Sequence, residues 1–324
     1  MKRIIRIGKW LLLSLLALHA VAAIVGFLYQ SLSQSSDLQR WPAPGRLVEV
    51  DGALMHIYCQ GTGSPTAILE QGTGSYYSHW GDLVGQLAAE TRVCAYDRAG
   101  MGYSESLDRP LRSDEVAARL HGLLQNAGIT DNIILIGWSL GGIHVRHYYK
   151  QFPEDVAGMI LLDSSHEQQQ QRFGDAAAPR GFDTRRIGAA LAGLGVIRIS
   201  GQMDAALDAA PGTAEHKARS KAVQLQTHWL RAYLNEFEAF RSDQALNSAP
   251  PSLRDLPLIV LTRGRAVPDS EQQREAVWQQ MQNELVQLST RRQQVIAHES
   301  GHSIHLDQPQ LVLDALRQML LITR

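Results

Sequence analysis

The chain has two kinds of hydrophobic pattern. Between Trp10 and Leu28 no Lys, Arg, Asp or Glu occurs, and the nine residues before this run contain four cations and no acid. From residue 45 onward the apolar residues instead form short runs, which polar and glycine-rich stretches separate. The first pattern is typical of a helix in a lipid bilayer, and the second is typical of a folded domain with strands and helices.

The uncharged run has a length that suits a membrane span. Its 19 residues approach the ~20 that a helix needs to cross the hydrocarbon core. We interpret residues 1–30 as a transmembrane signal anchor in preference to a cleaved signal peptide, although Ala20-Val21-Ala22 offers a small-residue cleavage site. In both cases the cations place the rest of the chain outside the cytoplasm, either anchored or secreted. Residues 31–44 are polar, contain two prolines and are interpreted as a linker.

Short apolar runs that alternate with helical patterns predict the architecture of the remaining chain. Two alternating runs, 47–50 and 54–58, flank the turn Asp51-Gly52 and predict a β-hairpin. Six further runs of strand length follow, at 67–69, 93–96, 133–136, 159–162, 258–261 and 295–297. Helical patterns lie between several of them, at 80–89, 114–124 and 140–149. The alternation predicts an α/β protein with a mostly parallel sheet, which an antiparallel hairpin opens.

One long stretch, residues 163–255, contains no convincing strand. Within it residues 203–246 are amphipathic, with large apolar residues at helical spacing, namely Trp229, Leu230, Tyr233, Leu234 and Phe237. We interpret the stretch as a helical cap inserted into the α/β core, with the polar segment 167–181 as a mobile entry. The core then comprises residues 45–162 and 256–324.

Composition and charge exclude several classes of protein. The sequence is 44% hydrophobic and 19% charged, which does not fit an intrinsically disordered chain. Its 31 Lys and Arg residues nearly balance 32 Asp and Glu, so the net charge is −1. Because nucleic-acid binding draws on an excess of positive charge, and we find no local basic patch, we expect no nucleic-acid partner.

The sharpest chemical motif is Gly137-Trp138-Ser139-Leu140-Gly141, which directly follows a predicted strand and directly precedes a helical pattern. A strand-to-helix turn this tight strains the backbone of its central residue, and the flanking glycines leave the space that the turn needs. Such a turn holds Ser139 clear of the sheet edge, at a helix N-terminus. We therefore predict that Ser139 is a nucleophile and not an ordinary surface serine.

From Gly45 to the C-terminus the motifs together resemble those of the α/β-hydrolase family. The segment Asp97–Ser104 is similar to the DxRGxGxS segment that follows the family's fourth strand, and Gly301-His302 is similar to its GH near the end. The order of nucleophile and histidine along the chain also matches. The resemblance implies an α/β-hydrolase fold. Dehalogenases and epoxide hydrolases, which use an aspartate nucleophile, are disfavoured because position 139 is a serine.

A serine hydroxyl needs a base within hydrogen-bond reach, and we predict His302, after the last predicted strand. For the carboxylate that orients this histidine, two candidates stay open. The commonest family pattern places the acid a few residues beyond the seventh strand, where the first acid is Asp269. Asp163 follows the sixth predicted strand, a position that some relatives use. We favour Asp163 over Asp269.

Acyl transfer also builds an oxyanion, which needs backbone donors aimed at it. The resemblance implies the amide of Leu140 and the amide of Thr73, in the turn after the third strand. Relatives usually read His-Gly in this turn, whereas this chain has Gln71-Gly72, so the side-chain support of the turn must differ. Asp97 and Arg98 are interpreted as a structural pair that braces adjacent loops.

Three histidines near the C-terminus, His298, His302 and His305, raise the alternative of a metal site. The glycine and the turn between them argue against a helix that presents all three, and the chain has no HExxH motif. We therefore expect no metal and no cofactor.

The two cysteines, Cys59 and Cys94, lie in the portion of the chain that is predicted to be exported. Their spacing alone leaves open a disulfide or two buried thiols. The strand order of the α/β-hydrolase family, which places the second strand beside the fourth, implies a disulfide between them.

These residues predict a serine hydrolase that cleaves a small-molecule carboxylic ester by way of an acyl-enzyme. An aminopeptidase on the same triad is an alternative, because Glu236 and Glu238 in the cap are candidates to hold a substrate amine. Cofactor-free perhydrolysis uses the same triad as well. A non-catalytic binding module on a hydrolase fold is the alternative from another class. The sequence does not indicate the acyl length or the oligomeric state.

Overall fold

The computed structural model describes residues 2–107, 109–130, 132–174, 184–201, 203–204, 213–243 and 248–323. Two compact units divide them. The smaller unit draws on the ranges Met1–Pro42 and Phe182–Arg231, and the larger unit draws on Ala43–Gly181 and Ala232–Arg324. Each unit is described below by itself.

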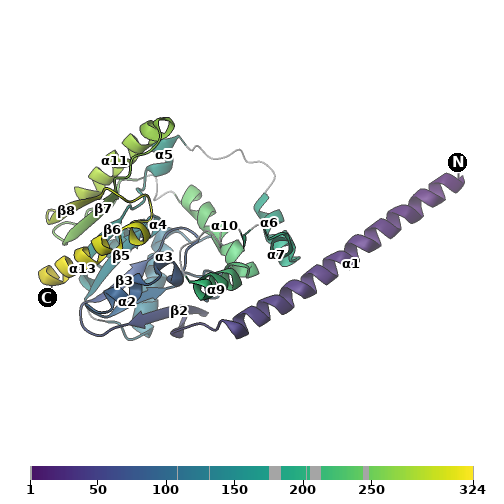
Figure 1. Ribbon diagram of the computed structural model, residues 1–324, viewed down its shortest axis with the longest axis horizontal. Helices are drawn as coiled ribbons and strands as arrows, with labels where there is room; N and C mark the ends of the chain where they lie inside the picture. The colour runs from purple at the N-terminus through teal and green to yellow at the C-terminus, as the bar shows by residue number, and fades with distance from the viewer. Residues whose placement is uncertain are drawn as a thin grey trace. The chain divides into compact units, whose positions relative to one another are not determined.

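An eight-stranded sheet forms the centre of the larger unit (Figure 1). Its strands are β1 (Arg46–Val50), β2 (Ala53–Gln60), β3 (Thr66–Glu70), β4 (Val93–Tyr96), β5 (Ile133–Trp138), β6 (Val156–Leu162), β7 (Leu258–Arg263) and β8 (Arg292–Ala297). Their order is β1-β2-β4-β3-β5-β6-β7-β8. The pairs β1–β2 and β2–β4 are antiparallel and the others are parallel. The predicted mostly parallel sheet with an antiparallel hairpin is confirmed.

The central strands are buried on both faces, because helices cover the sheet. The helical segments of the larger unit are η1 (Tyr77–Trp80), α2 (Leu83–Leu87), α3 (Ser113–Asn126), α4 (Leu140–Gln151), η2 (Pro153–Asp155), α5 (Gln169–Phe173), η4 (Asp269–Glu271), α11 (Gln272–Val286), α12 (Ile304–Asp307) and α13 (Pro309–Thr323). Side chains of α3, α4 and α11 share one hydrophobic cluster with the strands. Helix α13 packs against β6, where a Cβ at Gly158 would overlap the sulfur of Met319.

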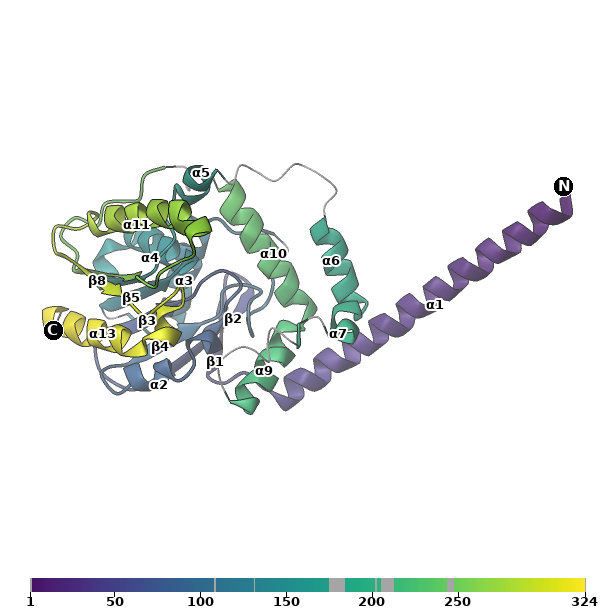
Figure 2. The same ribbon diagram turned by 45° about the horizontal axis from the view of Figure 1, so that its top comes forward.

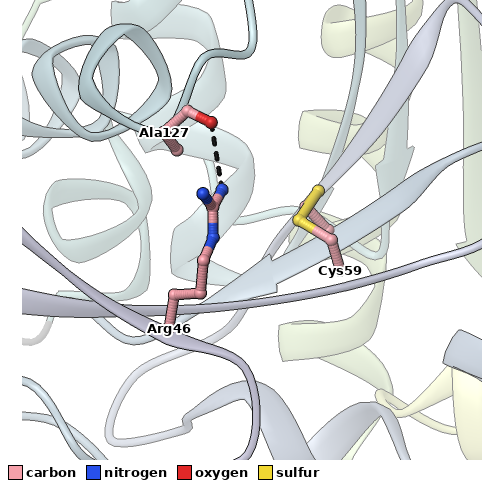
Figure 3. The surroundings of a disulfide bond; sticks show 4 residues. Arg46, Cys59 and Ala127 are labelled. Carbon is pink, nitrogen blue, oxygen red and sulfur yellow. Dashed lines mark hydrogen bonds between the residues drawn. A yellow bond between two sulfur atoms is a disulfide. The ribbon is translucent and has the colours of Figure 1, made fainter.

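A disulfide joins β2 to β4. The antiparallel register sets Cys59 opposite Cys94, and the two sulfurs are bonded (Figure 3). Beside the disulfide, Arg46 of β1 donates a hydrogen bond to the Ala127 carbonyl, at 3.0 Å. The predicted disulfide is therefore confirmed, and its physical basis is that the sheet brings β2 and β4 side by side.

Helix α1 (Lys2–Arg40) is one continuous helix and contains the predicted membrane segment (Figure 2). Among the described residues it is the one helix long and apolar enough to cross a membrane, and the same features suit a signal sequence. The helix also includes residues 31–40, which were interpreted as part of a linker. Proline does not occur before Pro42, so no proline interrupts the helix.

The remaining helices of the smaller unit are α6 (Thr184–Gly193), α7 (Val196–Ser200), α9 (Ala214–Gln224) and the start of α10 (Thr227–Ser242), whose later residues belong to the larger unit. Contacts with them hold the polar end of α1: Gln30 donates to the Leu225 carbonyl at 2.8 Å, and Asp37 pairs with Arg198 at 2.8 Å. These contacts explain why a polar segment is helical here.

The described residues between 163 and 255 contain helices and none of the strands of the sheet, as the sequence predicts. The polar segment 167–181 forms α5 in part, and its residues 175–181, predicted to be a mobile entry, lie outside the described residues. The boundaries of the anchor, linker, core and cap stay predictions.

Candidate active site

Ser139 stands between the end of β5 and the start of α4. Its backbone has φ 55° and ψ −124°, a strained conformation for a residue with a side chain. The neighbouring glycines make the turn possible, since a Cβ at Gly137 would lie 2.7 Å from the Gly142 Cα, and one at Gly141 would collide with the Glu70 carbonyl. The tight turn that the motif predicts is present, and Ser139 is partly exposed.

His302 lies in the loop between β8 and α12, with one ring nitrogen toward Ser139 and the other toward Asp163. The Nε2 atom is 2.9 Å from Ser139 Oγ, and the Nδ1 atom is 2.6 Å from Asp163 Oδ2. A neutral imidazole with its proton on Nδ1 fits both contacts, because it donates to the carboxylate and accepts from the hydroxyl. Trp138 fixes the loop by donating to the His302 carbonyl at 2.9 Å.

Asp163 is fully buried at the carboxyl end of β6, where its φ is 39°. Besides His302, it accepts hydrogen bonds from Trp278 Nε1 at 2.8 Å, from the Arg263 amide at 3.2 Å and from Arg263 Nη1 at 3.1 Å. A buried carboxylate stays charged only when such donors compensate for the loss of water. Arg263 in turn binds Glu275, at 2.6 Å. Burial lowers the pKa of Arg263, but the two carboxylates raise it by more.

The other candidate acid lies elsewhere. Asp269 is exposed in η4, where it accepts a hydrogen bond from Gln272 at 2.6 Å. The structure thus brings Asp163, and not Asp269, to His302. Sequence reasoning missed Arg263, Trp278 and Glu275 as partners of the acid. The sequence contained one indication of these partners. Arg263 ends β7, close to the position where the common family pattern has the carboxylate that orients the histidine.

The turn Gln71–Gly74 follows β3 and approaches Ser139. A Cβ at Gly72 would lie 3.1 Å from the Ser139 Cβ, so only a glycine leaves this approach unobstructed. The Gly74 amide is occupied, because it donates to Glu236 at 2.7 Å. The amide of Thr73 therefore stays the candidate oxyanion donor of this turn, together with the amide of Leu140, the residue after Ser139.

Gln71, which stands where relatives usually have a histidine, supports the turn in its own way. It is fully buried, its amide group donates to the Tyr96 carbonyl, and its side-chain oxygen accepts from Trp80 Nε1 at 3.4 Å. The side-chain support that the substitution put in doubt is thus supplied by contacts with β4 and η1.

Asp97 and Arg98 brace loops, but they do so with separate partners. Asp97 accepts from the amides of Tyr77 and Tyr103, at 2.7 and 2.9 Å, and contacts His56 Nδ1 at 2.8 Å. Burial lowers the pKa of His56, but Asp97 raises it by more. Arg98 instead binds two glutamates and two carbonyls of the turn that contains Thr73. The interpretation of these neighbours as one pair was therefore too simple.

The three C-terminal histidines have different surroundings. His298 is exposed, whereas His305 is buried against Trp138 and Trp80, with ring centroids 4.5 and 5.0 Å apart. Burial lowers the pKa of His305 to about 3, so it is neutral. Across the part of the chain that the structure describes, no group of three or more His, Cys, Asp or Glu side chains is arranged to hold a metal ion.

A small cavity, partly open to solvent, lies in the larger unit beside Leu140, the residue that follows Ser139. Apolar side chains of the core and of α10 line much of it, including Leu107, Leu140, Ala232, Ala239 and Phe240. Arg98, Arg109 and Glu236 also line it; Arg98 pairs with Glu236, and Arg109 pairs with Glu115. Next to Leu140 the lining of the cavity is therefore mainly apolar.

Residues 61–315 match the model of the alpha/beta hydrolase family. The chain belongs to this family. An uncharacterized protein of Bacillus subtilis is 27% identical over 172 residues, which are 52% of this chain and 53% of that protein. The matched part therefore spans about half the length of that relative.

Two solved structures have the same fold. A thermophilic esterase from Thermogutta terrifontis is 21% identical, with a TM-score of 0.58, over 86% of this chain and 99% of the esterase. A bacterial membrane phospholipase A is 20% identical, with a TM-score of 0.60, over 96% of this chain and 98% of that one. At these identities the likeness shows the α/β-hydrolase fold alone.

Proposed function

We propose that this protein is a serine hydrolase that cleaves carboxylic esters by way of an acyl-enzyme on Ser139. The observation that carries the proposal is the chain of contacts from Ser139 Oγ through both ring nitrogens of His302 to Asp163. His302 takes the proton of Ser139 as the oxygen attacks the ester carbonyl, and returns it to the departing alcohol. Asp163 accepts a hydrogen bond from the Nδ1–H of His302 and stabilises the imidazolium that forms between these steps.

The negative charge of the tetrahedral intermediate falls on the former carbonyl oxygen. The amides of Thr73 and Leu140 are the proposed donors to this oxyanion, and such prearranged donors are a large part of catalysis in acyl transfer. Water, activated by His302, then attacks the acyl-enzyme, releases the carboxylic acid and restores Ser139. These residues suffice for both half-reactions without a cofactor.

Ester cleavage is favoured over an aminopeptidase activity by the surroundings of the acidic cap residues. Glu236, the better placed of the two candidate amine ligands, is bound to Arg98 and to the Gly74 amide. Glu238 is exposed on α10. The mainly apolar cavity beside Leu140 likewise supports an uncharged substrate.

Three observations support a membrane-anchored protein whose catalytic domain lies outside the cytoplasm. Helix α1 is long and apolar, cations precede its uncharged run, and a disulfide joins Cys59 to Cys94, which an oxidising compartment favours. Fractionation of cells that express the full chain tests this. A full-length protein that only detergent releases from membranes supports the anchor, whereas a shorter soluble product would show a cleaved signal peptide.

The activity is tested with the full chain in detergent, on p-nitrophenyl acetate and butyrate. We expect turnover by the unmodified protein, none above background by Ser139→Ala, and labelling of Ser139 alone by a fluorophosphonate probe. Hydrolysis that survives in Ser139→Ala would overturn the proposal. An unmodified protein that neither hydrolyses esters nor reacts with the probe would instead indicate a binding module.

A further inference from the structure

Two side chains from distant parts of the larger unit hold the turn that carries the Thr73 amide. Arg98, which follows β4, donates from Nη1 to the Gln71 carbonyl and from Nη2 to the Gly72 carbonyl, each at 2.7 Å. Glu236, on α10, accepts from the Gly74 amide at 2.7 Å. The turn is therefore held by side chains on both sides of Thr73.

Because of the geometry of the peptide group, these contacts also fix the direction of one hydrogen-bond donor, the Thr73 amide. The Gly72 carbonyl and the Thr73 amide belong to the same peptide group, which is planar and trans, so the C=O and the N–H point in opposite directions. A bond that fixes the carbonyl therefore also fixes the direction of the N–H. The bond from Gly74 to Glu236 fixes the next peptide group.

The Arg98 guanidinium that makes these bonds is itself held in place. Glu236 binds it at two points, with 2.5 Å to Nε and 3.1 Å to Nη2, and Glu70 binds Nη1 at 2.6 Å. The Arg98 side chain is only 3% exposed. Burial lowers the pKa of Arg98, but the two glutamates raise it by more, so the guanidinium is charged. Its planar fork makes the orientation specific.

Helix α10 packs directly on the turn as well. Gly74 has a φ of 70°, and a Cβ at this position would collide with the ring of Tyr233, one turn before Glu236 on the helix. On the other side, Gly72 approaches Ser139. The turn thus has the nucleophile on one side and α10 on the other.

We propose that Arg98 and Glu236 are positioning residues for the hydrolysis on Ser139. Arg98 directs the Thr73 amide toward the oxyanion. Glu236 connects helix α10 to the same turn, so the position of α10 affects how the oxyanion is bound. This inference rests on the proposed function. Both side chains act on the oxyanion through the peptide groups next to Thr73.

Substitutions of Glu236 test the inference, with Glu238 on the exposed side of the same helix as the control. Glu236→Ala removes both contacts, whereas Glu236→Gln keeps an acceptor for the Gly74 amide and loses the charge that binds Arg98. The measurements are kcat and KM on p-nitrophenyl butyrate, the inhibition constant of a trifluoromethyl ketone that mimics the tetrahedral intermediate, and the melting temperature.

A misdirected donor costs transition-state stabilisation, and removal of one such donor costs about 10²–10³ in kcat. We expect Glu236→Ala to lower kcat by about 10- to 100-fold and to raise the inhibition constant of the ketone by a similar factor. KM should stay within about twofold of the original value. Glu236→Gln should recover part of both losses. Glu238→Gln should behave like the unmodified protein.

The outcomes separate this inference from the proposed function. If Glu236→Ala and Glu236→Gln fold and keep the original kcat and ketone affinity, the positioning role is wrong while the hydrolase stands. A rise in KM at constant kcat would make Glu236 a substrate-binding residue and would also overturn it. Should Glu236→Ala fail to fold, the graded loss expected for Glu236→Gln decides. Ester hydrolysis that survives in Ser139→Ala contradicts the function itself.

Discussion

Glu70 and Asp163 are fully buried carboxylates at the carboxyl ends of strands, and each faces an arginine. Glu70 ends β3 and pairs with Arg98, whereas Asp163 follows β6 and pairs with Arg263. Each arginine also binds a second carboxylate, a glutamate on α10 in the first case and on α11 in the second. The two sides of the candidate site therefore use the same arrangement of charges.

The two arrangements differ in what the carboxylate contacts besides its arginine. Glu70 accepts from the Tyr96 hydroxyl and contacts His144 at 3.3 Å, so its remaining partners are structural. Asp163 contacts His302, which in turn contacts the Ser139 hydroxyl. One arrangement thus supports the backbone of a turn, and the other is placed to act on a proton. The third partner, and not the ion pair, is therefore what distinguishes the two carboxylates.

The largest effect is expected for Asp163→Asn. An amide does not stabilise the imidazolium and favours the wrong tautomer, so kcat should fall by about 10⁴-fold, as in serine proteases. The measurement is kcat on p-nitrophenyl butyrate, with the melting temperature as a check on folding. If kcat fell by less than about tenfold, Asp163 would not differ in role from the structural carboxylate Glu70.

Glu70→Gln should act mainly on stability. Removal of one charge from a buried pair costs about 3 kcal/mol or more, so the free energy of unfolding should fall by about this amount at pH 7. Urea unfolding measures it. A variant as stable as the original protein would show that Glu236 alone compensates the buried charge of Arg98.

This stability difference should depend on pH. Burial raises the pKa of Glu70, but Arg98 and His144 lower it by more, so the folded-state pKa lies below 4.5. The folded protein then binds fewer protons than the unfolded chain, and stability rises with pH in this range. The advantage over Glu70→Gln is complete above about pH 4.5 and is lost as the pH falls through the lowered pKa. An advantage that does not change with pH would contradict this.

Trp278→Phe removes one donor from Asp163 and keeps the aromatic packing. A hydrogen bond to a charged group contributes about 1.5–3 kcal/mol, so a loss of about tenfold in kcat is expected, with little change in KM. Steady-state kinetics on the same ester measure it. An unchanged kcat would mean that Arg263 holds Asp163 without help.

The smallest effect is expected for Asp269→Asn, because Asp269 is exposed and contacts Gln272. Its kcat and KM should stay within about twofold of the original values, as is usual for surface substitutions. A loss comparable to that of Asp163→Asn would reverse the assignment of the acid.

Much of the fold follows from local patterns. Each of the eight strands contains one of the predicted apolar runs, because burial on two faces requires consecutive apolar residues and the hairpin requires alternation. The motif around Ser139 predicts its own turn, since glycines are needed on both sides of the strained residue. The end of α1 was predicted less well, because polar composition does not reveal that Asp37 has a partner in Arg198.

The sequence by itself determined the eight strands, several of the helices, the tight turn around Ser139 and a long apolar N-terminal segment. Each of these depends on residues that are close together along the chain. The charge network around the site was decided by the tertiary structure alone. Arg98 and Glu236 are 138 residues apart, and Asp163 and Arg263 are 100 apart. At such separations the spacing along the chain carries no information about contact. Only the packing of strand ends and of α10 determines which buried charge meets which partner.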